Sequence, residues 1–333
     1  MTYPAHRLSV APMMDWTDRH CRYLHRLMSR RALLYTEMVT APALVRGGAR
    51  HLLRYSPAEH PVAVQLGGSD PAELAEATAI CCEKGYDEVN LNVGCPSDRV
   101  QSGCFGAVLM ERPALVADCV AAMIKASSVE VTVKCRIGVD DQDPEKVLPD
   151  FLARVRDAGA RRVQIHARKA WLQGLSPKEN RDIPPLDDAL VYRMKDAFQD
   201  VDISINGGIP SLAQAKEMLA AGLDGVMIGR AAYHTPSDIL LDVDHEIFGE
   251  STRKSAHQVV RDMRPYIEKH LAEGGKLMSV CRHMLGMFSG RPGARVWRRI
   301  LSEKGHRPDA SWDLVEQALD CVEEFPESAE TTA

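Results

Sequence analysis

The sequence has few aromatic residues and no long apolar run. Phe, Trp and Tyr make up 5% of its 333 residues, although 45% are hydrophobic, so aliphatic side chains must form most of the core. No stretch of about 20 apolar residues occurs, and we therefore expect no membrane span. Charged residues make up 26%, which is ordinary for a globular chain. The length allows one large α/β barrel or two domains.

The sequence also lacks the cysteine spacings of a metal site or a disulfide framework. Its nine cysteines include no C-x-x-C pair, and Cys81 and Cys82 are adjacent in a helical pattern, where neighbours do not share a face. We therefore expect no metal and a reducing, cytoplasmic compartment. No G-x-G-x-x-G follows a first strand, which argues against a Rossmann nicotinamide site. The net charge of -5 excludes a chain that is basic throughout, but it allows a local basic face.

A regular alternation of strand and helix patterns runs through most of the chain. Short aliphatic runs predict eight strands, at 8–13, 33–39, 61–68, 88–94, 131–137, 162–168, 202–208 and 225–230. Helical patterns lie between most of them; Asp70, for example, is placed to cap a helix that Gly85 ends. Alternating strands and helices indicate parallel strands. We predict a (β/α)8 TIM barrel and keep a doubly wound open sheet as the alternative.

The strand signal stops at about residue 237, and the patterns that follow are helical. We therefore predict that residues 1–240 form the α/β barrel and that residues 241–325 form a C-terminal all-α helical domain. Residues 326–333 are small and acidic, and we expect them to form a disordered tail. No feature of the sequence predicts an obligate protein partner.

Polar residues gather at the predicted carboxyl ends of the strands, where barrel enzymes carry out their chemistry. They come from six strands and include Gln65, Asn92, Cys95, Lys134, Arg136, His166, Arg168, Asn206 and Arg230. A lysine is costly to bury in a strand unless an anion meets it. A structural ion pair would explain one such residue, but polar residues from six strands indicate a site.

Glycines after the last two predicted strands favour a phosphate site, because backbone N–H groups can approach an anion closely there. They are Gly207, Gly208 and Gly229, and Arg230 adds a charge. The phosphate could belong to a sugar or to a flavin. Lys134 favours the flavin, since a lysine stabilises the negative charge of its reduced ring. Pro12, Met13 and Met14 form an apolar turn that could lie under a planar ring, although core packing explains Met14 equally well.

The motifs "APMMDWTDR", "QLGG", "NLNVGCP", "VTVKCRIG", "INGGI" and "GVMIGR" resemble those of the tRNA-dihydrouridine synthase family. "HARKAWLQGLSPKENRDIPPLD" and "RHMLGMFSGRPGARVWRR" resemble its A-type subfamily. The resemblance covers the whole chain except the acidic tail. It implies an FMN-dependent barrel with a helical domain. It further implies NADPH-dependent reduction of uridine to 5,6-dihydrouridine at positions 20 and 20a of the tRNA D-loop.

The resemblance also implies roles for particular residues. The residues that bind FMN would be Pro12, Met13, Met14, Gln65, Lys134, His166, Asn206, Gly207, Gly208, Gly229 and Arg230. Those that place tRNA would be Asn92, Lys178, Arg181, Arg295 and Arg298. Cys95 would protonate C5 of the uracil while FMN N5 gives hydride to C6. A thiol suits this step, because its ordinary pKa of about 8.5 keeps it protonated near pH 7.

Two details leave alternatives open. Cys104 lies in the same loop as Cys95 and could compete as the acid, although the Gly-Cys-Pro context favours Cys95. Arg295 and Arg298 are three residues apart and share a helix face, which suits RNA phosphates but also describes an ordinary solvated face. Trp297, between them, either packs inward or stacks on a base.

Three other functions compete with the uridine reductase. One is a dihydroorotate-type flavin oxidoreductase, which would not need the basic helical region. Another is a flavin-free sugar-phosphate lyase or isomerase that uses Lys134 as a Schiff base. The last is a non-catalytic RNA-binding module, which the presence of Cys95 and Lys134 argues against.

Overall fold

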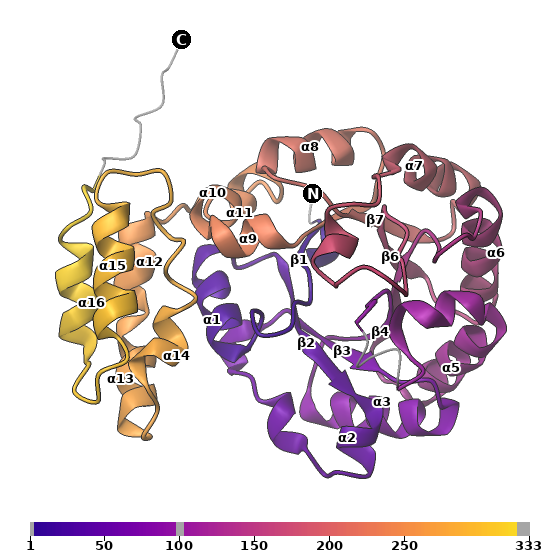
Figure 1. Cartoon of the computed structure of the whole chain (residues 1–333), viewed down its shortest axis with the longest axis horizontal. Helices are drawn as coiled ribbons and strands as arrows, with labels where there is room; N and C mark the ends of the chain where they lie inside the picture. The colour runs from indigo at the N-terminus through magenta and orange to yellow at the C-terminus, as the bar shows by residue number, and fades with distance from the viewer. Residues whose placement is uncertain (1–2, 98–102, 325–333) are drawn as a thin grey trace. The chain divides into compact units, whose positions relative to one another are not determined.

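The barrel predicted from the sequence is present in the computed structural model, which describes residues 3–97 and 103–324 (Figure 1). The strands are β1 (Leu8–Val10), β2 (Leu33–Thr40), β3 (Val62–Gly67), β4 (Glu88–Val93), β5 (Glu130–Arg136), β6 (Arg162–His166), β7 (Asp202–Asn206) and β8 (Gly225–Ile228). All pair in parallel with their neighbours, and β8 closes the barrel by pairing with β1. The prediction of a TIM barrel is confirmed.

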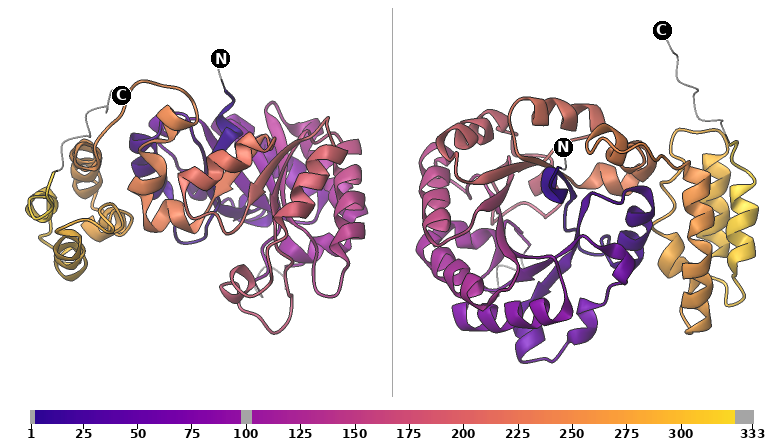
Figure 2. Two further views of the ribbon diagram at one scale, coloured as in Figure 1. Left: turned by 90° about the horizontal axis from the view of Figure 1, so that it is seen from above. Right: turned by 180° about the vertical axis from the view of Figure 1, so that it is seen from behind.

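Helices follow most of the strands and surround the barrel, as the right-hand view of Figure 2 shows. They are α2 (Ala41–Val45), α3 (Pro71–Lys84), α5 (Pro113–Ala126), α6 (Pro144–Asp157), α7 (Asp188–Ala197) and α8 (Leu212–Ala220). Short 3-10 helices are η1 (Ala5–Arg7), η2 (Arg50–Leu53), η3 (Pro57–Glu59), η4 (Gly106–Glu111) and η5 (Glu179–Arg181). The predicted cap is present: Asp70 accepts a 2.9 Å hydrogen bond from the Glu73 N–H, and Gly85 ends α3 with a φ of +93°.

The chain forms two compact units whose boundary differs from the predicted one at residue 240. The first unit comprises Met1–Thr17 and Ala32–Gly229, and the second comprises Asp18–Arg31 and Arg230–Ala333. Helix α1 (Arg19–Met28) therefore groups with the later helices, although it connects two barrel strands. Asp18, which caps the start of α1, connects this helix to the later part of the chain. Its carboxylate pairs with Arg282 at 2.5 Å and with His283 at 3.1 Å.

The second unit is helical, as the sequence predicts, but its helices are shorter. They are α9 (Arg230–His234), α10 (Pro236–Leu240), α11 (Val243–Glu246), α12 (Ala256–Asp262), α13 (Arg264–Ala272), α14 (Leu277–Cys281), α15 (Ala294–Lys304) and α16 (Trp312–Leu319). Helices α12 and α13 are separate because Pro265, at the start of α13, cannot continue a preceding helix. The predicted tail, 326–333, lies outside the described residues. Within 3–97 and 103–324, no helix is long and apolar enough to cross a membrane.

The interior of the barrel is polar along much of its length. Buried polar side chains that point inward from β3 to β7 include Gln65, Glu88, Asn90, Asn92, Thr132, Arg162, Gln164, His166 and Asn206. Because side chains alternate along a strand, Asn90 and Asn92 face the same side of β4. The barrel therefore carries hydrogen-bonding groups from the amino ends of its strands to the carboxyl ends.

Candidate active site

Cys95 lies in a turn that follows β4 and is held by hydrogen bonds on every side. The Asn92 side-chain oxygen accepts from the Gly94 N–H at 3.1 Å and from the Cys95 N–H at 3.0 Å. The Cys95 carbonyl accepts from the Ala107 N–H at 2.9 Å, and Arg136 Nε donates to the Gly94 carbonyl at 2.9 Å. The thiol is half-buried. It is therefore fixed in position at the carboxyl end of the barrel and remains accessible.

Gln65 and Asn92 meet beside this turn. Asn92 Nδ2 donates to Gln65 Oε1 at 2.8 Å, and both side chains are more than nine-tenths buried. The sequence assigns Gln65 to the flavin and Asn92 to the tRNA, and the structure brings these two residues together with Cys95 in one hydrogen-bonded group.

Lys134 occupies the neighbouring strand β5 and bonds to a neutral amide. Its Nζ donates to Asn206 Oδ1 at 2.9 Å, while Asn206 Nδ2 donates to the Met227 carbonyl at 2.8 Å. Burial, followed by the charge of Arg136, lowers the pKa of Lys134 from 10.5 to about 8. The lysine thus remains mostly cationic near neutral pH and is well placed to meet an anion.

Several other cations lie near Lys134. Burial, followed by the charges of Arg136, Lys134, Arg168 and Arg181, lowers the pKa of His166 well below its usual value. His166 is therefore neutral near pH 7, and the carboxyl end of the barrel has a concentrated positive charge. Such a potential favours an anionic ligand such as a phosphate or a reduced flavin.

The glycines after β7 are required by their surroundings. Gly207 has a φ of +112°, and a Cβ on it would lie 2.5 Å from Cδ2 of the His166 ring. Gly208 has a φ of +68°, and a Cβ there would clash with the side chain of Leu186. The backbone at Gly207 therefore lies close to His166, and both positions have a left-handed φ that favours glycine.

The turn after β1 is closed by Thr17. The Met13 N–H donates to Thr17 Oγ1 at 3.0 Å, and the Met13 carbonyl accepts from the Thr17 N–H at 2.9 Å, so Pro12 enters a fixed turn. A Cβ on Gly229 would lie 3.7 Å from the Met13 sulfur, which places the ends of β1 and β8 together. Met14 is 53% exposed, and core packing therefore does not explain it.

Lys178 and Arg181 belong to a long loop that is organised around Asn180. This amide is fully buried and bonds to both the N–H and the carbonyl of Trp171, at 2.7 and 2.9 Å. Arg136 donates to the carbonyls of Asn180 and Lys169, each at 3.0 Å. One guanidinium therefore fixes both this loop and the Cys95 turn.

The remaining predicted residues lie in the second unit. Arg295 and Arg298 are exposed on α15, as is Arg299. Trp297 packs inward: it is fully buried, its ring contacts Phe288, and its Nε1 donates to the Met284 carbonyl at 3.0 Å. Of the two open possibilities for Trp297, stacking on a base is therefore excluded. Arg230 begins α9, directly after Gly229.

Sequence reasoning missed the roles of several residues in this region. Arg136 and Asn180 hold the loops, and Asn90 lies beneath Gln65. The signal for Asn90 was present, because it is two residues before Asn92 and so faces the same side of the strand. Asn180 offered no such signal, since it lies in an irregular loop.

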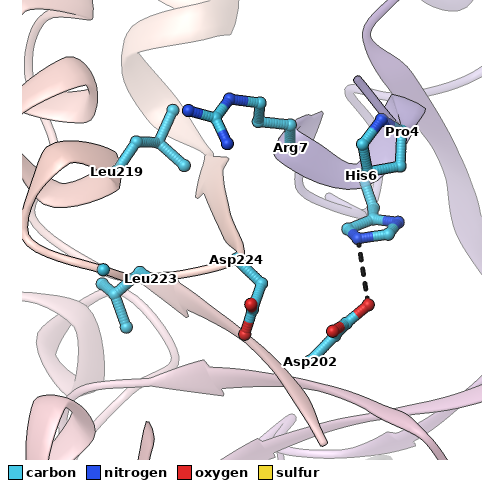
Figure 3. A pocket seen from close by; sticks show the side chains of 8 residues that line it. Pro4, His6, Arg7, Asp202, Leu219, Leu223 and Asp224 are labelled. Atoms are coloured by element: carbon cyan, nitrogen blue, oxygen red, sulfur yellow. Dashed lines mark ion pairs between the residues drawn. The ribbon is translucent and has the colours of Figure 1, made fainter. Parts of the chain in front are cut away.

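A cavity of about 340 Å³ opens at the opposite end of the barrel (Figure 3). Its walls include His6, Arg7, Asp202 and Asp224, and His6 Nε2 lies 3.3 Å from the Asp202 carboxylate. Burial, followed by the charge of Arg162, lowers the pKa of His6 to about 4, so the ring is neutral at pH 7. None of the residues assigned to the site from the sequence lines this cavity.

A reaction centre at the carboxyl ends of eight parallel strands is the arrangement of TIM-barrel enzymes. The dihydrouridine synthase family model matches residues 9–326. This chain belongs to that family, as its motifs indicated. No group of three or more His, Cys, Asp or Glu side chains that could hold a metal occurs among the described residues.

Two relatives show how far the similarity extends. The tRNA-dihydrouridine(20/20a) synthase of Vibrio vulnificus is 57% identical over 315 residues, which cover 94% of this chain and 96% of the relative. The protein of that name in Escherichia coli K12 is 58% identical over 318 residues, or 95% and 91% of the two chains. Among solved structures, an old yellow enzyme homologue from Zymomonas mobilis shares the fold. Its TM-score is 0.50 at 12% identity, over 74% of this chain and 90% of that one.

Proposed function

We propose that this protein reduces uridine to 5,6-dihydrouridine at positions 20 and 20a of the tRNA D-loop, with bound FMN and with NADPH as the reductant. The observation that carries the proposal is the fixed thiol of Cys95 next to the Gln65–Asn92 pair and the cationic carboxyl end of the barrel. The names of relatives that align along nearly their whole length support the same reaction.

The residues at this end of the barrel fit a flavin. Lys134 is a half-buried cation whose Nζ bonds to the neutral amide of Asn206. The missing side chains of Gly207 and Gly208 leave space beside His166 and Leu186. Pro12, Met13 and Met14, Gln65, His166, Asn206, Gly229 and Arg230 would complete the FMN site. When bound, FMN supplies hydride to C6 of the uracil, and NADPH restores the reduced flavin.

Cys95 acts as the proton donor in this proposal. Its Sγ gives a proton to C5, so the two hydrogens added across the C5–C6 bond are accounted for, and the thiolate then takes a proton from water. Asn92 keeps the Cys95 backbone in place during this step. Cys104, the competing thiol, is exposed and has a left-handed φ of +57°.

Two sets of basic side chains would contact the tRNA. Lys178 and Arg181 stand on the Asn180 loop, and Arg295 and Arg298 stand on the exposed face of α15. Contacts from these side chains to phosphates would position the D-loop, whose target uridine must leave its stack to reach Cys95. Residues 241–325 would thus form a tRNA-binding domain. Because the substrate would be tRNA, we also expect the activity to be cytoplasmic.

The reaction is tested with the purified protein and unmodified tRNA transcript. We expect a flavin absorbance spectrum, oxidation of the NADPH-reduced flavin when tRNA is added, and dihydrouridine at positions 20 and 20a after mapping of the product. Mapping of tRNA from a strain that lacks the gene should show the loss of dihydrouridine at these two positions. A colourless protein, or reduced flavin that unmodified tRNA does not oxidise, would contradict the proposal.

The assignment of α15 needs its own test. We expect Arg295→Ala with Arg298→Ala to weaken tRNA binding about 10- to 100-fold and to lessen its salt dependence, because two phosphate contacts are lost. Reduction of the flavin by NADPH should stay at the wild-type rate. Equal tRNA affinity in the double variant would refute the role of this helix.

A further inference from the structure

A chain of hydrogen bonds runs through the barrel from the Cys95 turn towards the amino ends of the strands. The Cys95 N–H donates to Asn92 Oδ1 at 3.0 Å, and Asn92 Nδ2 donates to Gln65 Oε1 at 2.8 Å. Gln65 Nε2 then donates to Asn90 Oδ1 at 2.8 Å. Each amide accepts from the group above it and donates to the group below it.

The same direction continues below Asn90. Its Nδ2 donates to Thr132 Oγ1 and to Gln164 Oε1, each at 2.8 Å. The Thr132 hydroxyl donates to Glu88 Oε1 at 2.5 Å. The chain, which we call the amide relay, therefore links Cys95, Asn92, Gln65, Asn90, Thr132 and Glu88.

Glu88 determines the direction of the relay because a carboxylate can only accept hydrogen bonds. Thr132 must donate to Glu88, and its oxygen is then left to accept from Asn90. That requirement turns the nitrogen of Asn90 towards Thr132 and its oxygen towards Gln65. An amide side chain without such a constraint can rotate by 180° and exchange its donor and acceptor ends.

Three donors surround the Glu88 carboxylate: the Thr132 and Tyr35 hydroxyls and the Arg162 guanidinium. It is 2% exposed and lies 2.6 Å from the guanidinium of Arg162. Tyr35 also donates its hydroxyl to Glu88 at 2.5 Å, and burial, followed by the charge of Glu88, raises the pKa of Tyr35 well above its usual value. Tyr35 therefore stays protonated and remains a donor.

The relay has a consequence at the thiol. Asn92 Oδ1 accepts from two successive backbone N–H groups, those of Gly94 and Cys95. If the Asn92 amide rotated, its NH2 group would face these two donors and the turn would lose both hydrogen bonds. We propose that Glu88 is a positioning residue for Cys95, which acts through the amide relay to hold the oxygen of Asn92 against the Cys95 turn. Its effect on turnover rests on the proposed function.

Glu130 offers a control for Glu88, although its side chain is 43% exposed and that of Glu88 is 2% exposed. Its carboxylate also lies 2.6 Å from Arg162 and starts the neighbouring strand, but no hydrogen bond joins it to Thr132 or Tyr35 among the described contacts. A purely structural effect of losing a carboxylate beside Arg162 should therefore appear in both Glu88→Gln and Glu130→Gln. An effect transmitted by the relay should appear only in Glu88→Gln.

Thr132 supplies a second, nearly isosteric test. Thr132→Val removes the hydroxyl that connects Asn90 to Glu88 and keeps the shape of the side chain, whereas Thr132→Ser keeps the hydroxyl. The FMN-loaded variants are treated with iodoacetamide, and alkylation of the peptide that contains Cys95 is followed by mass spectrometry. Oxidation of the reduced flavin by unmodified tRNA is measured in parallel.

We expect Glu88→Gln and Thr132→Val to alkylate Cys95 about threefold faster, because the turn is released and the thiol is more accessible. The tRNA-dependent oxidation should slow about tenfold, with little change in the KM for tRNA. Thr132→Ser and Glu130→Gln should behave as wild type. If Glu88→Gln does not fold, the Thr132 pair decides the question.

The proposal would be overturned if Cys95 in Thr132→Val were alkylated at the wild-type rate. It would also be overturned if Glu88→Gln and Glu130→Gln changed the alkylation and oxidation rates equally. The alkylation assay needs no tRNA. A wild-type protein that makes no dihydrouridine would therefore contradict the proposed function, while the alkylation rates would still decide the relay.

Discussion

The cations at the two ends of the barrel have different kinds of partners. At the amino end, Arg162 pairs with the carboxylates of Glu88 and Glu130, each at 2.6 Å. At the carboxyl end, Lys134 bonds to the neutral amide of Asn206, and Arg136 bonds to backbone carbonyls. A cation that already has a carboxylate contributes to the fold, whereas a buried cation held by neutral groups keeps its charge available for an anionic ligand.

The pKa values follow this difference. Burial works against the charge of Arg162, but Glu88 and its other anionic neighbours outweigh it, so the pKa of Arg162 lies above its usual value. At the carboxyl end, burial lowers the pKa of Lys134 to about 8 and that of Arg136 to about 10. At the amino end, carboxylates therefore compensate for the burial of the cation. At the carboxyl end, the burial of positive charge costs free energy that a bound anion would offset.

The largest expected effect is at the thiol. Cys95→Ala should reduce dihydrouridine formation about 1000-fold, within the range for loss of a general acid, while the protein keeps its FMN and its stability. Nucleoside analysis of the tRNA measures dihydrouridine formation, the visible spectrum measures bound FMN, and the Tm measures stability. Cys104→Ala is the matched control and should remain active. The opposite result, an active Cys95→Ala and an inactive Cys104→Ala, would move the acid to Cys104.

The next effect concerns the charge of Lys134. Lys134→Met should slow flavin reduction by NADPH about 10- to 100-fold, because the reduced ring loses a buried cation. In the wild type the rate should fall as the pH rises through about 8, since the ammonium is then lost; a bound anion moves this fall upward. Lys134→Arg should keep the charge and shift the fall to higher pH. Stopped-flow absorbance checks all three, and a fall at the same pH in Lys134→Arg would exclude Lys134 as its cause.

The effect of rising pH on the stability of the protein is opposite to its effect on the rate of flavin reduction. The folded pKa of Lys134, about 8, lies below its ordinary value of 10.5, so the unfolded chain binds more protons between these values. The buried charge therefore destabilises the ligand-free protein below pH 8, and this cost is relieved as the pH rises towards 10.5. The residue that we propose to support the reaction thus lowers the stability of the ligand-free fold below pH 8.

A smaller effect is expected from adding a methyl group to a glycine at each end of the barrel. Gly207→Ala should weaken FMN binding about tenfold, because the Cβ would press on the His166 ring in a left-handed backbone conformation. Gly222 has a similar φ of +104°, lies at the amino end, and has no atom within 4 Å of an added Cβ. Gly222→Ala should therefore carry the backbone strain alone and bind FMN as the wild type does. Fluorescence titration with FMN compares them, and equal losses would attribute the effect to strain.

The smallest effect is at the paired end. Lys195 Nζ lies 2.7 Å from the Asp224 carboxylate, which also accepts from the Ile203 N–H. Lys195→Met should lower the free energy of unfolding by about 1 kcal/mol and leave the rate of dihydrouridine formation unchanged. Urea denaturation measures the free energy of unfolding, and Lys195→Arg should restore it to the wild-type value. A loss of activity without a loss of stability would break the distinction between the two ends.

The strands were predictable because each leaves a local signal. All eight aliphatic runs became strands, and their ends moved by only a few residues, as at β4, which spans Glu88–Val93. The polar residues at the carboxyl ends were predictable for the same reason, since a residue that follows a buried run in a barrel must face the mouth. The resemblance to a known family then gave these residues their expected roles.

The parts that the sequence did not predict depend on contacts between distant segments. The sequence does not reveal that α1 groups with later helices, because the pairing of Asp18 with Arg282 spans 264 positions. Local patterns likewise could not show that Arg136 joins two loops or that Glu88 ends the relay.

The double attachment of Arg136 matters for redesign of the enzyme. Its guanidinium holds the Gly94 carbonyl on one side and the carbonyls of Lys169 and Asn180 on the other. Substituting Lys178, a proposed tRNA contact on this loop, leaves these carbonyl acceptors in place. Shortening or replacing the whole loop would instead remove two acceptors of Arg136 and disturb the turn that carries the thiol.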